Sequence, residues 1–291
     1  MVPAFWGLKK RARKTLAHVR TPGIDEVILH WRSDHPRKSA QARLAVGHAW
    51  TLRTGLFLLL LASLSVSLAI QAGVFEVNGC GSTVQSIQPA HKVALIDSLS
   101  LDMPNPDFVK GIASLSSASG YHFDYYPPDN FSFDVLTNLP QLGYSILIFR
   151  THGALGEPVV ATSMVYSSSS HVRAQLGGEL GRVQVDQRQY FGILPSFVTK
   201  DMCGQFPGTL VLGMGCTSLG GDALAKAFVE KGAAGFVGWN GWVTQGHTDA
   251  VFTYLVRLLL SGDSVGPAVS HTMRTVGADP ATGSILTHYP S

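Results

Sequence analysis

The chain has 291 residues, of which 45% are hydrophobic and only 14% are charged, and its formal net charge at pH 7 is +3. This length and composition indicate a folded, rather apolar chain with one or two domains. Eleven of the 22 Lys and Arg residues lie within residues 1–53, with only three of the 19 acidic residues, so the rest of the chain is mildly acidic. The basic overall charge therefore gives no support for nucleic-acid binding by the main part of the chain.

Residues 1–53 mix basic residues with Pro, Ser and His. Such a segment is typical of the solvated cytoplasmic flank of a membrane anchor, and a nucleic-acid-binding tail is the alternative. The next segment, residues 54–75 (TGLFLLLLASLSVSLAIQAGVF), has no charged residue over 22 positions. A helix of that length crosses the hydrocarbon core of a bilayer, which is about 30 Å thick.

Residues 54–75 have two other possible interpretations, a buried core helix and a cleaved signal peptide. A buried core helix is usually shorter, and a cleaved signal peptide ending near Ala72 would need a much shorter charged region than the 53 residues that precede the span. We therefore expect one transmembrane helix in the cell membrane. Because the basic residues lie on its N-terminal side, the N-terminus is expected in the cytoplasm and the C-terminal domain outside it.

Residues 76–91 are rich in Gly, Ser and Gln and are expected to form a linker. The chain has three cysteines, which are too few for a disulfide framework. Outside the cytoplasm Cys80 and Cys203 could pair and leave Cys216 free, and three unpaired thiols are the equally open alternative. No Cys or His spacing supports a metal site.

From Lys92 onward, strand patterns alternate with helix patterns. Helices are expected at 105–120, with Asn105 as N-cap, at 221–232, at 248–262 with Thr248 as N-cap, and at 264–276, followed by a loose tail. Buried strands are expected at 92–99, 145–149 and 209–213, and further strands at 121–126 and 233–239. Residues 157–207 break this rhythm and are expected to form a hairpin-like insertion. The alternation predicts a three-layer α/β domain over residues 92–291, with a mostly parallel sheet.

Two of these strand patterns end at residues with useful chemistry. The run SILIFRTHG leads to His152 and Gly153, and the run TLVLGMGCTS leads to Cys216. In open α/β sheets, catalytic groups gather at the carboxyl ends of the strands. Neighbouring strands lie about 4.8 Å apart, so a Cys–His pair is expected if the two strands are adjacent.

The residues beside this pair suit nucleophilic catalysis. A thiolate that attacks a carbonyl needs an imidazole to move protons and backbone N–H groups to hold the developing oxyanion. Gly153 lets its N–H approach a substrate closely, and Gly213 and Gly215 allow a tight turn before Cys216. Thr217 and Ser218 are expected to lead into a helix whose dipole would stabilise the thiolate. The alternative is that neither residue is catalytic, with Cys216 a small buried side chain and His152 a structural histidine.

Strands ending in His-Gly and then in Gly-Cys make residues 92–276 resemble the clan CD cysteine peptidases, the group of caspases, legumain, gingipains, clostripain and CHAT domains. The RTHG and MGC blocks also resemble those of a group of membrane-anchored prokaryotic proteins. The resemblance implies the caspase–hemoglobinase fold, His152 as proton carrier and Cys216 as nucleophile. It further implies an oxyanion hole made by the N–H groups of Gly153 and Cys216. Cys216 is followed by Thr-Ser rather than the Arg-Gly of caspases, so a preference for Asp is not implied.

The resemblance also places the segment KGAAGFVGWNGW at the substrate pocket. Trp239, Asn240 and Trp242 would then form a pocket wall, with core or rim packing as the alternative. Asp249 would favour a Lys or Arg side chain if it reached the pocket, and otherwise complements a helix dipole. His247 is expected at the surface.

The leading hypothesis is a membrane-anchored cysteine endopeptidase that cleaves peptide or protein substrates outside the cytoplasm. A catalytically silent caspase-like module for binding or signalling is the alternative. A class I amidotransferase-like enzyme using Cys216 with His247 or His271 is a third possibility, although its Gly-x-Cys-x-Gly elbow is not met here. The dyad needs no metal or organic cofactor, and the phosphate-binding glycine motifs are missing from the sequence.

Overall fold

A computed structural model describes residues 90–154 and 159–290 of the chain. The basic segment, the predicted membrane span and nearly all of the linker therefore lie outside the described residues. Within the described ranges, no helix is both long and apolar enough to cross a membrane.

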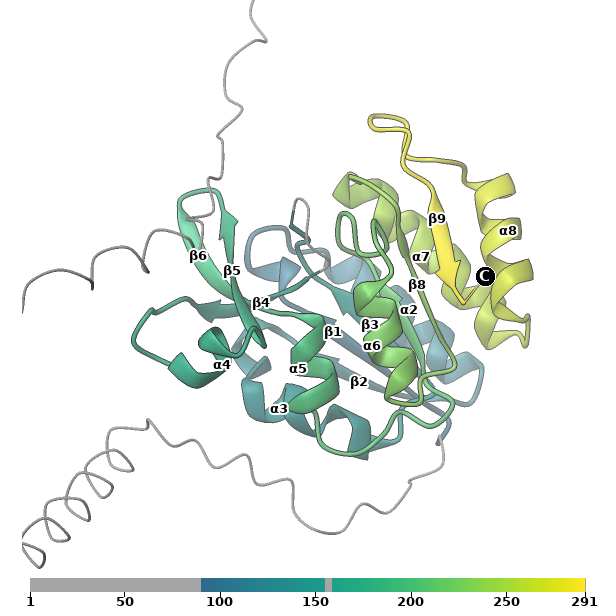
Figure 1. The fold of residues 1–291 in the computed structure, drawn as a ribbon. Helices are drawn as coiled ribbons and strands as arrows, with labels where there is room; N and C mark the ends of the chain where they lie inside the picture. Colours follow the sequence, from purple (N-terminus) through teal and green to yellow (C-terminus); the bar gives the residue numbers. More distant parts are fainter. Residues whose placement is uncertain (1–89, 155–158, 291) are drawn as a thin grey trace, which may run out of the picture. The chain divides into compact units, whose positions relative to one another are not determined.

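The core of the fold is a six-stranded sheet (Figure 1) with the strand order β2-β1-β3-β7-β8-β9. The first five of these strands pair in parallel, and β9 is antiparallel to β8. The bounds are β1 Lys92–Asp97, β2 His122–Tyr126, β3 Ile146–Arg150, β7 Leu210–Gly213, β8 Gly235–Trp239 and β9 Leu286–Tyr289. The expected mixed α/β fold with a mostly parallel sheet is confirmed.

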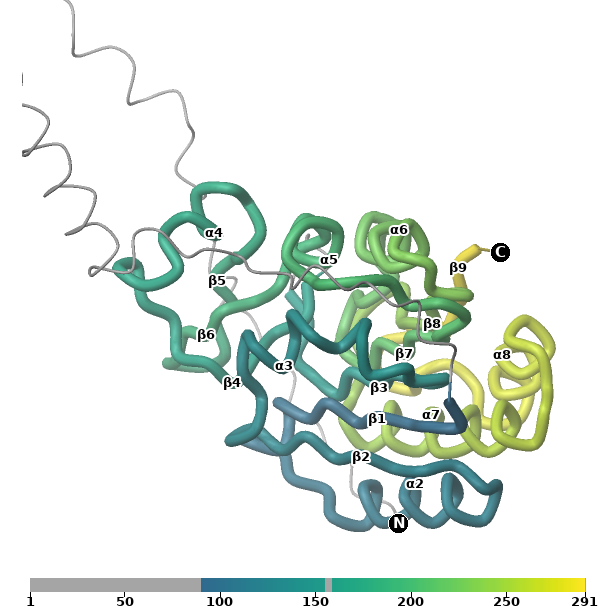
Figure 2. The backbone as a smooth tube through the Cα atoms, turned by 90° about the horizontal axis from the view of Figure 1, so that it is seen from below, coloured from purple at the N-terminus to yellow at the C-terminus, as the bar shows by residue number. Residues whose placement is uncertain are grey.

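Both faces of this sheet are buried beneath helices (Figure 2). In β1, Ala94 and Ile96 point into one apolar core, and Val93 and Leu95 point into the other. The first core is shared with α3 Phe133–Asn138, α5 Pro195–Lys200 and α6 Ala223–Glu230. The second is shared with α2 Pro106–Ala118, α7 Gln245–Leu260 and α8 Val265–Thr275. Burial on both sides explains why the central strands β1, β3, β7 and β8 are largely apolar runs, whereas the edge strand β2 has a mixed sequence and no fully buried residue.

The first helix shows how local sequence sets these elements. Asn105 caps α2 by accepting a hydrogen bond from the Phe108 N–H at 3.0 Å, and Pro106 follows at the first helical position, as expected. Gly120, just past the helix, has a φ of +77°, which glycine adopts without strain. Three short 3-10 turns complete this half of the chain: η2 Leu99–Leu101, η3 Pro128–Asn130 and η4 Leu139–Leu142.

The insertion forms a second sheet of three antiparallel strands in the order β4-β6-β5. Its elements are β4 Val160–Val165, α4 Val172–Leu176, β5 Leu180–Val185 and β6 Arg188–Ile193. The sequence predicted the hairpin of β5 and β6 but neither α4 nor α5. Ser98, just after β1, donates to the Ala161 carbonyl at 2.8 Å, so β4 begins beside the carboxyl ends of the main strands.

Two predictions about the C-terminal third were wrong. Helix α7 begins at Gln245 with Thr244 as N-cap, one turn before the expected start. Thr248 does not cap a helix, because its hydroxyl accepts from Trp239 Nε1 at 2.9 Å and donates to the Met214 carbonyl at 3.1 Å. The expected loose tail contains β9, which pairs with the exposed edge of β8 and supplies hydrogen bonds to it.

Candidate active site

Strands β3 and β7 lie side by side, and their ends are in register. The last pair of the ladder is Phe149 with Gly213, and the Met214 N–H donates to the Phe149 carbonyl at 2.9 Å. His152 and Cys216 each follow three residues beyond that pair. The two residues therefore leave the same edge of the sheet from adjacent strands, as the sequence predicted.

Beyond the ladder the two loops pack backbone against backbone. A Cβ atom on Gly153 would lie 1.8 Å from the Cys216 carbonyl oxygen, and one on Gly215 would lie 2.8 Å from the Thr151 carbonyl oxygen. Neither position can hold a side chain unless a backbone moves. The glycines are therefore required by the close approach of the loops, beyond the freedom to turn that the sequence suggested.

Cys216 is a free, partly exposed cysteine. Both hydrogen bonds of its thiol are with Val243: Sγ donates to the Val243 carbonyl and accepts from the Val243 N–H, each at 3.5 Å. Within the described residues, none joins the thiol to His152. Cys203 is disulfide-bonded, which rules out three unpaired thiols, and Cys80, the partner that the sequence offered as one of two possibilities, lies outside the described residues.

Thr217 fixes the backbone that carries Cys216. Its φ is +52°, a left-handed conformation that is unusual for a β-branched residue and often occurs at functional sites. Its N–H donates to the Gly241 carbonyl at 2.8 Å, and its hydroxyl donates to the Ala154 carbonyl at 2.7 Å. Thr217 thus ties the loop after β7 to the loops after β8 and β3.

The expected helix does not directly follow Cys216. Ser218 holds a tight turn, donating to the Gly213 carbonyl at 2.8 Å and accepting from the Trp239 N–H at 3.0 Å. Helix α6 starts only at Ala223. Turn and bend residues separate Cys216 from α6, so the thiol does not directly precede the first helical residues where a helix dipole acts most strongly.

The imidazole of His152 faces a carboxylate that sequence reasoning missed. Its Nε2 lies 3.4 Å from Asp102 Oδ2, and both side chains are about a quarter exposed (25% and 27%). Nε2 itself is buried, and within the described residues it has this ion-pair neighbour but no hydrogen-bond partner. Asp102 follows β1, and its place after the neighbouring strand was the one signal that could have found it.

Two backbone N–H groups lie on the loops that carry His152 and Cys216. In the part of the chain that the structure describes, neither the Gly153 N–H nor the Cys216 N–H donates a hydrogen bond. Both belong to the loops that pack against each other. Both N–H groups are therefore available, within the described residues, to an acceptor from a bound substrate, and an oxyanion is held by such backbone donors.

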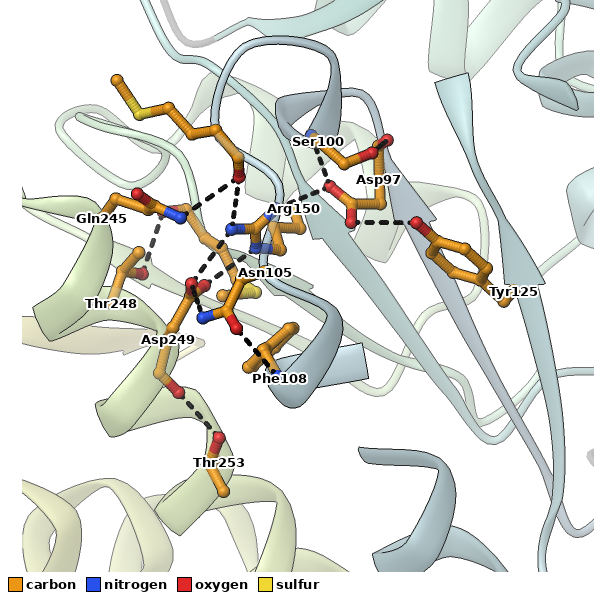
Figure 3. Close-up of polar contacts among 12 residues, drawn as sticks. Asp97, Ser100, Asn105, Phe108, Tyr125, Arg150, Gln245, Thr248, Asp249 and Thr253 are labelled. Carbon is orange, nitrogen blue, oxygen red and sulfur yellow. Dashed lines mark hydrogen bonds and ion pairs between the residues drawn. The ribbon is translucent and has the colours of Figure 1, made fainter. Parts of the chain in front are cut away.

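Two residues before His152 in the chain, Arg150 is the centre of a buried cluster of charged side chains (Figure 3). Arg150, the last residue of β3, is fully buried and donates to Asp97 Oδ1 at 2.9 Å. It also donates to the two oxygens of Asp249, at 2.8 and 3.0 Å, and to the Met103 carbonyl at 3.0 Å. Asn105 adds a bond to Asp249 at 2.8 Å. The cluster joins the ends of β1 and β3 to α7 and to the segment that carries Asp102.

The pKa shifts in this cluster follow from burial and charge. Burial raises the pKa of Asp97 above its usual value, and the Arg150 guanidinium only partly offsets this. Burial by itself lowers the pKa of Arg150, but the hydrogen bonds and charges of Asp249 and Asp97 outweigh it and raise that pKa overall. The guanidinium is therefore held in its charged form.

The residues expected to form a substrate pocket are spread over different environments. Trp239 is fully buried in the core, and Asp249 is buried with its carboxylate engaged by Arg150, so neither side chain is available to a substrate. Asn240 is exposed and accepts from the Ile285 N–H at 2.9 Å. Trp242 is half exposed and directly precedes Val243, the residue that contacts the thiol.

The two histidines of the amidotransferase interpretation contact other partners. His247 Nε2 lies 3.2 Å from the Gly277 carbonyl, and its ring packs near Trp239. His271 lies against Tyr254 on the outside of α8. Within the described residues, neither forms a hydrogen bond with Cys216, and no group of three or more His, Cys, Asp or Glu residues could hold a metal ion.

Comparisons with known proteins give no further assignment. No protein-family model matches the chain, and no curated protein sequence is significantly similar to it.

Proposed function

We propose that the chain is a cysteine endopeptidase with a caspase-like fold, in which Cys216 is the nucleophile and His152 carries the proton. One observation carries this proposal: a free thiol and an imidazole leave adjacent parallel strands at equal distances beyond the last pair of the ladder. Carboxyl ends of parallel strands are where catalytic groups of α/β proteins gather. The two loops that bear them are in direct backbone contact.

In the proposed reaction, His152 takes the thiol proton and the sulfur electron pair forms a bond to the carbonyl carbon of the substrate. The carbonyl electrons move onto oxygen, then return as the C–N bond breaks. His152 gives its proton to the leaving amine, and a thioester remains on Cys216. Water, deprotonated by His152, then attacks the thioester and releases the carboxylic acid and the thiol.

Two further features support this chemistry. The free N–H groups of Gly153 and Cys216 would hold the oxyanion as it forms. Asp102 lies at Nε2 of His152, which leaves Nδ1 as the ring nitrogen to exchange protons with the thiol and the amine. A carboxylate in that position would stabilise the imidazolium that forms during the reaction.

We place this domain outside the cytoplasm, anchored by the predicted span at residues 54–75. The basic residues of segment 1–53 favour that orientation. The disulfide of Cys203 supports it as well, because disulfides persist in oxidising compartments and are rare in the cytosol.

The test is labelling of the full-length chain with a panel of peptidyl acyloxymethyl ketones, followed by mass spectrometry. We expect labelling at Cys216 that is lost in Cys216→Ala and in His152→Ala. His271→Ala is the matched control, because His271 is an exposed histidine away from the thiol, and it should label like the wild type. If no probe labels Cys216 while iodoacetamide reaches it, the endopeptidase proposal fails.

A catalytically silent binding module is the second candidate. One observation favours it: the thiol bonds to Val243 and the imidazole faces Asp102, so no bond joins the two side chains within the described residues. Catalytic hydrogen bonds are often long before a substrate binds, so this geometry is compatible with either function. The labelling experiment separates them.

A further inference from the structure

The thiol of Cys216 is held by a loop from β8 rather than by a helix. The Val243 N–H donates to Sγ at 3.5 Å, and the Val243 carbonyl accepts from the S–H at the same distance. When the thiol loses its proton, the bond to the carbonyl is lost and the bond from the N–H becomes charge-assisted and stronger. The position of the Val243 peptide therefore influences how easily the thiolate forms.

That loop, residues 240–244, is braced by a buried carboxylate. Asp279 Oδ2 accepts from the N–H of Thr244 at 2.7 Å and from its hydroxyl at 2.8 Å. Asp279 Oδ1 accepts from the N–H groups of Ala281 and Thr282, at 2.9 and 3.0 Å. Asp279 is 1% exposed, so these four donors replace nearly all of its water.

The rest of the segment 279–285 follows the same loop along its length. Thr282 donates its hydroxyl hydrogen to the Trp242 carbonyl. Asn240 exchanges bonds with Ile285, accepting from its N–H at 2.9 Å and donating to its carbonyl at 3.2 Å. A Cβ atom on Gly241 would lie 2.6 Å from Ser284 Oγ, so the two segments are tightly packed.

We propose that Asp279 is a positioning residue for the nucleophile: through Thr244 it holds the Val243 N–H against Cys216 Sγ and so promotes formation of the thiolate. This inference rests on the proposed role of Cys216. Asp279 is ionised under ordinary conditions, because although burial by itself raises its pKa, the hydrogen bonds from Thr244, Ala281 and Thr282 lower it to about 2. As a negative charge, Asp279 would disfavour a nearby thiolate, so its effect through position and its effect through charge have opposite signs.

Other titratable groups border these segments. His247 on α7 has Nε2 at 3.2 Å from the Gly277 carbonyl, and His152, with Asp102 at its side, lies on the loop that packs against Cys216. Substitution of Asp279 leaves all of them in place. A difference in the ionisation of Cys216 between the wild type and a variant at Asp279 therefore reports on the position of the loop 240–244.

The experiment measures the rate of Cys216 alkylation by iodoacetamide against pH in the full-length chain. In Asp279→Asn, an amide nitrogen faces two donors, and we expect the midpoint of the profile to move upward by at least about half a pH unit. Asp263→Asn is the control, since it removes one exposed acid beyond the end of α7 and should leave the midpoint unchanged. An unchanged or lower midpoint in Asp279→Asn overturns the proposal.

Thr244→Val is the second variant, in case Asp279→Asn does not fold. It removes only the hydroxyl bond and keeps the N–H bond, so a smaller upward movement is expected, and none would contradict the proposal. Thr244→Ser should restore the wild-type profile. The readout needs no peptide substrate. If no peptidyl probe labels Cys216 but the alkylation midpoint of Asp279→Asn moves upward, the endopeptidase is rejected and the positioning role is kept. If the probes label Cys216 but the midpoint does not move upward, only the positioning role is rejected.

Discussion

The two halves of the candidate site are braced by buried carboxylates in opposite electrostatic settings. On the His152 side, Asp97 and Asp249 share one buried guanidinium, Arg150, and burial raises the pKa of Asp97. On the Cys216 side, the hydrogen bonds that Asp279 accepts from described residues come from neutral hydroxyl and N–H groups, and they outweigh burial and lower its pKa to about 2. One brace depends on charge pairing in the interior, and the other depends on hydrogen bonds to backbone.

This difference has consequences for stability. An ion cluster that loses its cation leaves two unpaired buried charges, which is far more costly than losing one hydrogen bond. A carboxylate held by N–H groups fixes a loop without a buried counter-charge. We therefore expect a substitution in the cluster around Arg150 to cause a large loss in the free energy of unfolding. A substitution at Asp279 or its partners should cause a smaller loss.

The largest expected effect comes from Arg150→Met. The variant keeps much of the side-chain volume but leaves Asp97 and Asp249 without their cation, and we expect the free energy of unfolding to fall by about 3–5 kcal/mol. Denaturant unfolding measures this. Arg274→Met, at an exposed position of α8, should change it by less than about 0.5 kcal/mol. Equal effects of the two variants would remove the distinction between the braces.

Gly153→Ala should come next. The added Cβ would lie 1.8 Å from the Cys216 carbonyl oxygen, so the loops must separate, at a cost of about 1–3 kcal/mol, and probe labelling of Cys216 should be lost. Gly111→Ala in α2 meets nothing within 4 Å and should be neutral or stabilise the helix by up to about 1 kcal/mol. Normal labelling of Gly153→Ala would show that the loops do not need this contact.

The two braces should also respond to acid in opposite directions. Because the folded-state pKa of Asp279 is depressed to about 2, its contribution is present above pH 4 and is lost as the pH falls toward 2, on the order of 1–2 kcal/mol. The raised pKa of Asp97 has the reverse sign: its contribution is largest at low pH and declines as the pH rises through its folded value. Denaturant unfolding between pH 2 and 5 should therefore show a steeper acid loss in the wild type than in Asp279→Asn. If the free energy of unfolding falls equally steeply with pH in both proteins, the depressed pKa of Asp279 is contradicted.

The smallest effect on stability is expected for Asp102→Asn. Its carboxylate is partly exposed and 3.4 Å from His152 Nε2, so the free energy of unfolding should change by less than about 0.5 kcal/mol. Labelling of Cys216 by a peptidyl probe should nevertheless slow about tenfold, because the imidazolium loses its partner. Asp107→Asn, an acid in the first turn of α2, is the control. Equal labelling rates would exclude an orienting role for Asp102.

Much of the main sheet could be predicted from sequence because its signals are local. Continuous apolar runs marked the buried strands, and Asn105 with Pro106 marked the start of α2. The adjacency of β3 and β7 followed from the general rule for parallel sheets and put His152 and Cys216 at one edge. Helix α7 began elsewhere because its N-terminus is fixed by Asp279, 34 residues beyond its first residue, and no local pattern shows that.

The expected pocket illustrates a second limit. The charge of Asp249 and the ring of Trp239 were visible in the sequence, but their use depends on partners distant in the chain. Arg150, 99 residues before Asp249 in the chain, donates hydrogen bonds to the Asp249 carboxylate. Trp239 is buried in the hydrophobic core. Asp102 escaped notice for the same reason, since only the fold brings the segment after β1 to the imidazole of His152.

The most direct test of the central claim, that the two strand ends form one site, is the pH–rate profile of Cys216 alkylation by iodoacetamide in the wild type and in His152→Ala. A small alkylator does not depend on substrate recognition. If the imidazole serves the thiol, its removal should move the midpoint to higher pH by about one unit and slow the reaction at pH 7 by about tenfold. Superimposable profiles would show that the thiol and the imidazole act independently and would contradict the account.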